Sequence, residues 1–142
     1  MPLTLEIVTA ERVVFQDDNV DMVVAPSVDG HVGILPRHSP LLTALQVGEL
    51  RVIKGNDEQS IVLAGGFMEV LNNKVTILAE AAERSEEIDL ATAQDARARA
   101  EATIANRGQG GDLAAAELAM RYNMVRLRVG TKRRSGGRRR DE

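Results

Sequence analysis

The sequence predicts an α+β protein with two modules, an N-terminal all-β sandwich over residues 1–84 and a C-terminal antiparallel two-helix hairpin over residues 85–130. Short runs in which apolar and polar residues alternate recur through the first module, separated by turn-forming residues, which is typical of a sandwich or barrel. An alanine-rich region with helical spacing follows. The charge changes at the same place: residues 1–90 carry 6 basic and 15 acidic side chains, whereas residues 91–142 carry 12 basic and 6 acidic ones. Two modules of opposite charge are therefore expected.

The strand pattern occurs in several segments of the first module. The second of them is expected to end at Pro26, because proline cannot donate to a strand ladder. Asn72 and Asn73 separate the last two segments and are expected to form a tight hairpin, since asparagine tolerates positive φ. The predicted strand segments are residues 3–9, 19–26, 49–54, 59–71 and 74–80.

Two helices are predicted after the sandwich. Asp89 is the expected N-cap of the first helix and Asp112 of the second, and Gly130 is expected to end the second helix. Because the facing side chains are small, we expect the pair to be weakly held and able to move. The predicted contact stripes are Leu90, Ala93, Ala100 and Ile104 on the first helix and Leu113, Ala116, Met120, Met124 and Leu127 on the second.

The last segment, residues 131–142, is charged and contains glycine, so it is expected to be disordered. Three roles for it remain open: a solvated tail, a nucleic-acid-binding arm, or a segment that docks on an acidic protein surface. The acidic first module disfavours the nucleic-acid role, because phosphate would repel it.

No catalytic, metal or cofactor site is predicted. His31 and His38 lie seven residues apart with only Asp29 nearby, too few ligands for a metal, and the chain has no cysteine. Ser39 beside His38 is not a nucleophile–base arrangement. The glycines of GHVG (30–33) and AGGF (64–67) do not form a phosphate loop, so they indicate turns and close backbone approach. Aromatic residues make up 2% of the chain, which disfavours a stacking platform for nucleic acid. No apolar run approaches the roughly 20 residues that span a bilayer, and the N-terminus does not have the pattern of a secretory signal.

Three segments carry a resemblance to a known family. They are DGHVGILPRHSPLLTALQVGELRV (29–52), AGGFMEVLNNKVTILAEAAER (64–84) and EEIDLATA (86–93). Together they resemble the epsilon subunit of F-type ATP synthases, in order and with matching spacing over nearly the whole chain except the arginine-rich end. The resemblance implies a non-catalytic rotor subunit that couples proton translocation to ATP synthesis.

The resemblance also implies partners for each module. The sandwich would bind the gamma subunit and rest on the c-ring, without inserting into the membrane itself. The residues expected at these contacts are Gly30, His31, His38, Leu41 and Leu42. The hairpin would fold back or extend into the alpha/beta catalytic head and restrain ATP hydrolysis. Basic residues on the second helix would face acidic segments of the head, namely Arg121, Arg126 and Arg128.

Some bacterial members of the family bind ATP at a motif Ile/Leu-Asp-x-x-Arg-Ala. Thr92 replaces the arginine of this motif, and Tyr122 stands where such members carry another arginine, so weak or no ATP binding is expected. The matching positions are Ile88, Asp89, Ala93, Arg99 and Arg126.

The implied location is peripheral, on the cytoplasmic face of the plasma membrane rather than on a thylakoid. Two other classes stay open at this stage. One is a free-standing β-sandwich that binds a protein, and the other is a small enzyme, which the missing nucleophile–base pair disfavours.

Overall fold

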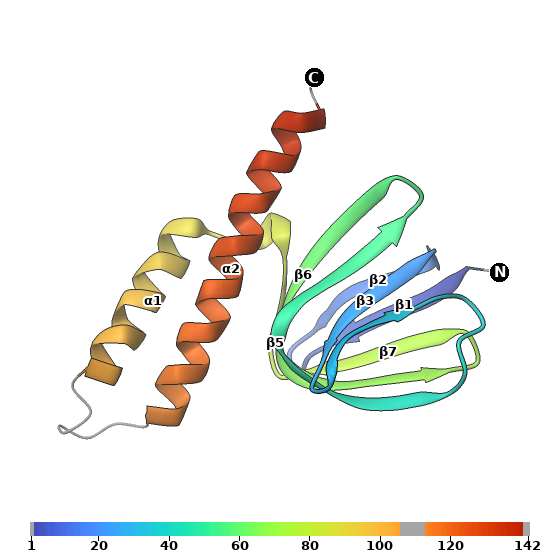
Figure 1. The fold of residues 1–142 in the computed structure, drawn as a ribbon, viewed down its shortest axis with the longest axis horizontal. Helices are drawn as coiled ribbons and strands as arrows, with labels where there is room; N and C mark the ends of the chain where they lie inside the picture. The colour runs from blue at the N-terminus through green and yellow to red at the C-terminus, as the bar shows by residue number, and fades with distance from the viewer. Residues whose placement is uncertain (1, 106–112, 141–142) are drawn as a thin grey trace. The chain divides into compact units, whose positions relative to one another are not determined.

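A computed structural model describes residues 2–105 and 113–140, with side chains described as far as Lys132. The chain divides into two units, Met1–Arg84 and Ser85–Glu142. The first contains the strands and the second the helices (Figure 1). The expected capping residue Asp112 lies outside the described residues.

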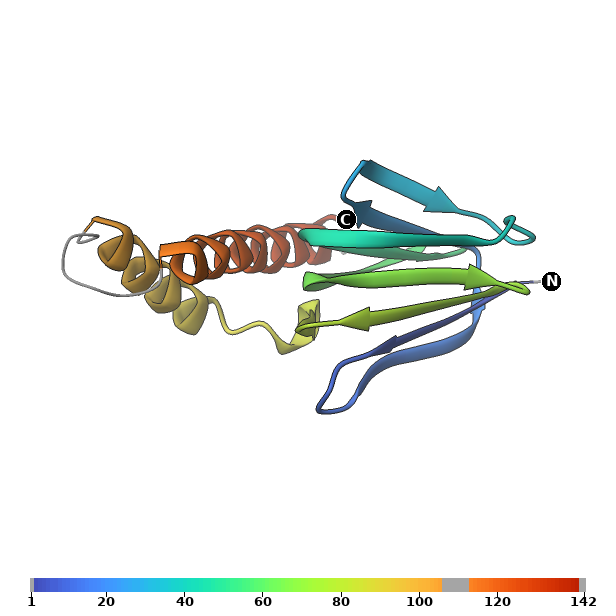
Figure 2. The same cartoon turned by 90° about the horizontal axis from the view of Figure 1, so that it is seen from below.

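The strands form a continuous ladder in the order β2-β1-β7-β6-β5-β3-β4, and β8 pairs with β6. The β1–β7 pairing is parallel, and the other pairings are antiparallel. In Figure 2, β1 and β2 lie at one side of the sandwich and β3 and β4 at the other. The strands are β1 (Leu3–Val8), β2 (Val13–Val20), β3 (Met22–Ser27), β4 (Gly30–Ile34), β5 (Leu41–Lys54), β6 (Asp57–Leu71), β7 (Lys74–Ala79) and β8 (Ala82–Arg84).

Along strand β6, the side that faces the core changes at a pair of glycines. The core-facing residues Ile61 and Leu63 have odd numbers, but after the pair Met68 and Val70 face the core. Gly65 and Gly66 have φ of 109° and 136°, and this break in the alternation reverses the faces of the strand. A Cβ at Gly66 would lie 2.1 Å from the Leu78 oxygen, so the expected close backbone approach at AGGF is confirmed.

The core is aliphatic, because each of the strands β1 to β7 contributes Leu, Ile, Val or Met side chains to it. Fully buried members of large volume include Leu3, Leu5, Ile7, Ile34, Leu50, Ile61, Leu63, Met68 and Ile77. Asn72 and Asn73 have φ of 50° and 63° and join β6 to β7, which confirms the predicted tight hairpin.

The predicted strand over residues 19–26 is wrong in two respects. It is divided at Asp21 between β2 and β3, and Pro26 lies inside β3, opposite His31 of β4. The pairing of β3 with β5 shifts register between Val24 and Ser27, so the proline sits where the ladder to β5 is already interrupted.

The second unit contains the short helix η1 (Ser85–Glu87), α1 (Leu90–Ala105) and α2 (Leu113–Arg140). The two long helices lie side by side as a hairpin (Figure 1). The carboxylate of Asp89 accepts hydrogen bonds from the N–H groups of Ala91 and Thr92 at 3.0 and 3.3 Å, which confirms the predicted N-cap.

The predicted end of the second helix at Gly130 is wrong, whereas the expected disorder of residues 131–142 stays a prediction. The backbone of α2 continues to Arg140. Lysine and arginine are good helix formers and no proline interrupts the segment, which favours the continuation, whereas Gly136 and Gly137 disfavour it.

The predicted contact stripe of α2 holds except at one position. Ala116 is buried, and Leu113, Met120 and Leu127 are half-buried. Met124, however, is 45% exposed, whereas Asn123 is buried. Positions 123 and 124 both lie three or four residues from Met120 and Leu127, so either position fits the helical spacing of the stripe. Asn123 tolerates burial because its Nδ2 donates to the Ala119 carbonyl at 2.8 Å.

Candidate contact surfaces on the sandwich and the hairpin

An apolar row crosses one face of the sandwich. In the strand register, the first residue of β2 pairs with the end of β1, which pairs in turn with β7, β6 and β5. Beyond β3, the N–H of Val28 donates to the Ala44 carbonyl at 3.0 Å and continues the row. We call these residues the apolar row: Val13, Val8, Leu78, Phe67, Ala44 and Val28.

The row is open to solvent. Phe67 is 58% exposed and Leu78 is 59% exposed, although they lie opposite each other in the ladder. Leu42 is 72% exposed and lies diagonally from Phe67, since it pairs with Glu69 and Ala44 pairs with Phe67. Diagonal neighbours in antiparallel strands are about 7–8 Å apart, within reach of an aromatic side chain. Large apolar side chains gathered on one face in this way are typical of a protein contact site.

The residues expected at the gamma and c-ring contacts lie on separate elements. Gly30 has φ of 117° at the start of β4, and His31 follows it, exposed. His38 is half-buried in the connection to β5, where its Nδ1 lies 2.7 Å from the Ser39 carbonyl. Leu41 packs against the core, and Leu42 faces outward. Of the five, therefore, only Leu42 adjoins the apolar row.

Phe67 and Leu78 were missed from the sequence, although a pattern could have identified them. Met68 and Val70 alternate with Phe67 along β6, and Val75 and Ile77 precede Leu78 along β7. Once the buried members of these runs are assigned to the core, the alternation places Phe67 and Leu78 on the outer face.

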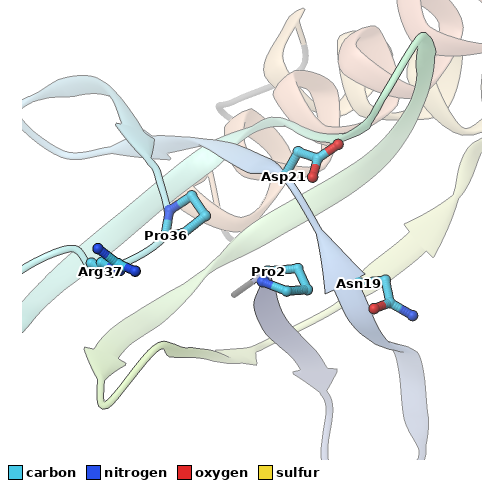
Figure 3. A pocket seen from close by; sticks show the side chains of 5 residues that line it. All are labelled: Pro2, Asn19, Asp21, Pro36 and Arg37. Atoms are coloured by element: carbon cyan, nitrogen blue, oxygen red, sulfur yellow. The ribbon is translucent and has the colours of Figure 1, made fainter.

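An open hollow of about 560 Å³ lies elsewhere on the sandwich, lined by Pro2, Asn19, Asp21, Pro36 and Arg37. The carboxylate of Asp21 and the guanidinium of Arg37 point away from each other (Figure 3). The Asp21 carboxylate accepts the backbone N–H of Gly55 at 2.6 Å, and the backbone N–H of Arg37 donates to Oδ1 of Asn73 at 2.9 Å. These polar groups therefore tie the turns of the sandwich together.

The basic residues of α2 divide into two kinds. Arg121 and Arg128 are exposed and seven residues apart, so they lie on the same helix face. Arg126 is half-buried: its Nη1 donates to Oδ1 of Asn123 at 2.6 Å, and its guanidinium lies 5.8 Å from the centre of the Tyr122 ring.

The residues of the degenerate ATP motif also have structural roles in the hairpin. Ile88 and Ala93 are buried. The pKa of Asp89 is lowered, chiefly by the backbone hydrogen bond from Thr92 and more weakly by the charge of Arg126. The Nε of Arg99 is directed to the Asp95 carbonyl at 3.4 Å, within its own helix.

Within residues 2–105 and 113–140, no three His, Asp or Glu side chains are grouped so that they could hold a metal ion. In the same part of the chain, neither long helix is apolar enough to cross a membrane.

Comparison with known proteins matches both units. Residues 2–85 match the family model described as ATP synthase, Delta/Epsilon chain, beta-sandwich domain, and residues 86–130 match the long alpha-helix domain of the same chain. An ATP synthase epsilon chain of Herpetosiphon aurantiacus is 56% identical over 135 residues, covering 95% of this chain and 98% of its own. One of Chloroflexus aurantiacus is 56% identical over 129 residues, covering 91% and 92%.

A solved structure has the same fold. A chain in the mitochondrial ATP synthase of Euglena gracilis superposes with a TM-score of 0.72 at 24% identity, over 87% of this chain and 78% of its own. The family models together match residues 2–130, and the two epsilon-chain relatives are each 56% identical over more than nine tenths of this chain. The chain therefore belongs to the ATP synthase epsilon-chain family and is a non-catalytic subunit of that enzyme.

Proposed function

We propose that this epsilon chain is a rotor subunit of the central stalk, with the gamma subunit bound along the apolar row and the c-ring bound near Gly30, His31 and His38. The observation that supports the gamma contact is the continuous register of apolar side chains across the sandwich, in which Val8 and Ala44 are half-buried and the other four are exposed. In this position the sandwich transmits rotation between the c-ring and the catalytic head, and it reaches the cytoplasmic face of the plasma membrane through its partners.

Phe67→Ser tests the gamma contact. Because aromatic side chains bury roughly 150–250 Å² and 58% of Phe67 is exposed, on the order of 100 Å² of it is available to a partner. At about 25 cal/mol per Å², burying this area contributes about 2.5 kcal/mol, so affinity for gamma should fall roughly tenfold to a hundredfold.

Leu35→Ser is the matched control, because Leu35 is 56% exposed but lies between β4 and β5, outside the apolar row. Affinity for purified gamma should be measured by calorimetry for both variants. Equal losses in the two, or an unchanged affinity in Phe67→Ser, would contradict the proposed contact. A chain that ends at Arg84 should still bind gamma, since the row lies wholly within the first unit.

The hairpin restrains ATP hydrolysis through the exposed basic face of α2. Arg121 and Arg128 are available to acidic segments of the head, whereas Arg126 is engaged within the hairpin. Replacing Arg121 and Arg128 by alanine should raise hydrolysis by the whole complex, most clearly at low ionic strength, because exposed charges are screened by salt. Arg97→Ala is the control, since Arg97 pairs with Glu101 on α1. An unchanged rate would assign the restraint to steric contact.

ATP binds this hairpin weakly or not at all. Asp89 already accepts two backbone N–H groups, and Arg126 is held by Asn123 and Tyr122, so the kept polar groups of the motif have partners within the hairpin. Calorimetric titration of the full-length chain with ATP should show no saturation at micromolar concentrations. A low-micromolar dissociation constant that Asp89→Ala abolishes would overturn this expectation.

A further inference from the structure

Gly130 is a buried glycine inside a helix. It lies within α2, its φ is not positive, and α2 continues beyond it. Glycine destabilises a helix interior relative to alanine, so a helical glycine that does not serve as a cap usually has a packing role. The surroundings of Gly130 show what that role is.

The chain that enters α1 crosses α2 at this glycine. A Cβ on Gly130 would lie 2.5 Å from Cδ2 of Leu90 and 3.4 Å from Cγ2 of Ile88. Ile88 is buried and its N–H is directed to the Ser85 carbonyl at 3.3 Å, while Leu90 is the first residue of α1. The absence of a side chain at position 130 is therefore what allows Leu90 and Ile88 to sit against the backbone of α2.

On the α1 side, the buried residues are alanines, Ala93 and Ala100. On α2, Ala116, Val125 and Val129 are buried. Alanine allows close approach but buries little apolar area. Leu90 and Ile88 carry larger side chains than the alanines of α1, so they add apolar contact with α2 at Gly130.

We propose that Gly130 is a notch that receives Leu90 and Ile88 and holds α1 and α2 together at the end of the hairpin where α1 begins. The hairpin opens only when Leu90 leaves the notch. The effect of this opening on ATP hydrolysis rests on the proposed function, in which the opened hairpin extends into the catalytic head. The notch itself is a property of the hairpin alone.

An exchange of large and small residues tests the notch. Gly130→Leu fills it and should open the hairpin. Leu90→Ala combined with Gly130→Leu moves the bulk from α1 to α2 and should restore the closed pair. Thr131→Leu is the control, because it adds the same side chain at the neighbouring exposed position.

Pulsed electron paramagnetic resonance measures the separation directly. The chain has no cysteine, so spin labels can be placed on cysteines introduced at Gln94 of α1 and Met124 of α2, both exposed. Gly130→Leu should shift the main distance to longer values in the full-length subunit. The double variant and Thr131→Leu should keep the distance of the parent chain.

The proposal is overturned if Gly130→Leu leaves the distance unchanged, or if Leu90→Ala fails to reverse its shift. Circular dichroism at 222 nm checks that both helices persist, and the double variant remains decisive if the single one unfolds. Hydrolysis by the reconstituted complex separates the two proposals. A shifted distance that Leu90→Ala reverses, with an unchanged hydrolysis rate, supports the notch and contradicts the regulatory role of the hairpin.

Discussion

Replacing Gly66 by alanine should be among the most damaging single-methyl additions to the sandwich. The new Cβ would lie 2.1 Å from the Leu78 oxygen and 2.8 Å from Cα of Ala79. Both are backbone atoms of β7, the strand that pairs with β6 at this point, so neither can move away by a change of rotamer. Relief of the clash requires β6 and β7 to separate locally.

Two effects add to the loss of stability. Gly66 has φ of 136°, a region that residues with a Cβ rarely adopt, and holding alanine there costs about 1–3 kcal/mol. Forcing an extra methyl group into packed structure adds about 1–3 kcal/mol. The total of about 2–6 kcal/mol is a large part of the 5–15 kcal/mol that stabilises an ordinary domain.

Gly30→Ala separates the two effects. Gly30 has φ of 117°, but a Cβ there would meet no atom within 4 Å, so this variant carries the conformational effect without the clash. In calorimetric melting of the full-length chain, a loss of 1 kcal/mol lowers the midpoint by roughly 4–8 °C for a domain of this size. The sandwich transition of Gly66→Ala should therefore fall at least about 5 °C below that of Gly30→Ala. Equal midpoints for the two variants would refute the steric argument.

Three further substitutions test other interactions. Lys54→Met removes the donor 2.6 Å from the Asp17 carboxylate and should cost about 1 kcal/mol near pH 7. The hydrogen bond from Lys54 is the largest cause that lowers the pKa of Asp17 below its ordinary 3.8. The stabilisation from this pair is therefore present above pH 3.8 and is lost as pH falls through the lower pKa of the folded state. In urea unfolding, the difference in stability between Lys54→Met and the parent chain should be smaller at pH 3 than at pH 7. Asn123→Ala removes the acceptor 2.6 Å from Arg126 and should lower the stability of the hairpin by about 1–2 kcal/mol in thermal melts at 222 nm, whereas an unchanged melt would show that the contact is dispensable. Met68→Ala empties a fully buried position and should cost about 2–5 kcal/mol in denaturant unfolding of the sandwich; a loss below 1 kcal/mol would mean that the core collapses around the gap.

Much of the fold could be predicted because local chemistry determines it. The Asn72–Asn73 pair needs positive φ, and the structure has it there. Asp89 can accept the free N–H groups of a helix start, and it does so. Strands such as β1 alternate strictly between buried and half-buried residues, so the period of two identified them. Each of these features depends on residues that are neighbours in the sequence.

Features that depend on distant neighbours were predicted less well. Gly130 resembles a helix end in the sequence, yet its role depends on Leu90, which lies 40 residues earlier. Pro26 resembles a strand end, yet it remains inside β3 because the register to β5 shifts beside it. Glycine and proline can act through the local backbone conformation or through packing against residues that are distant in the sequence. The neighbouring residues in the sequence indicate only the first of these roles.

The apolar row shows the same limit for a contact surface. Alternation along one strand can assign Phe67 to the outer face, but it cannot say which residues of other strands lie beside it. The parallel pairing of β1 with β7 brings Val8 next to Leu78, and the antiparallel pairing of β6 with β7 adds Phe67. Phe67 or Leu78 alone would be an ordinary exposed apolar residue. These residues form a continuous row only because the strand register brings them side by side. This continuity distinguishes a contact surface from exposed apolar residues that are scattered over a protein.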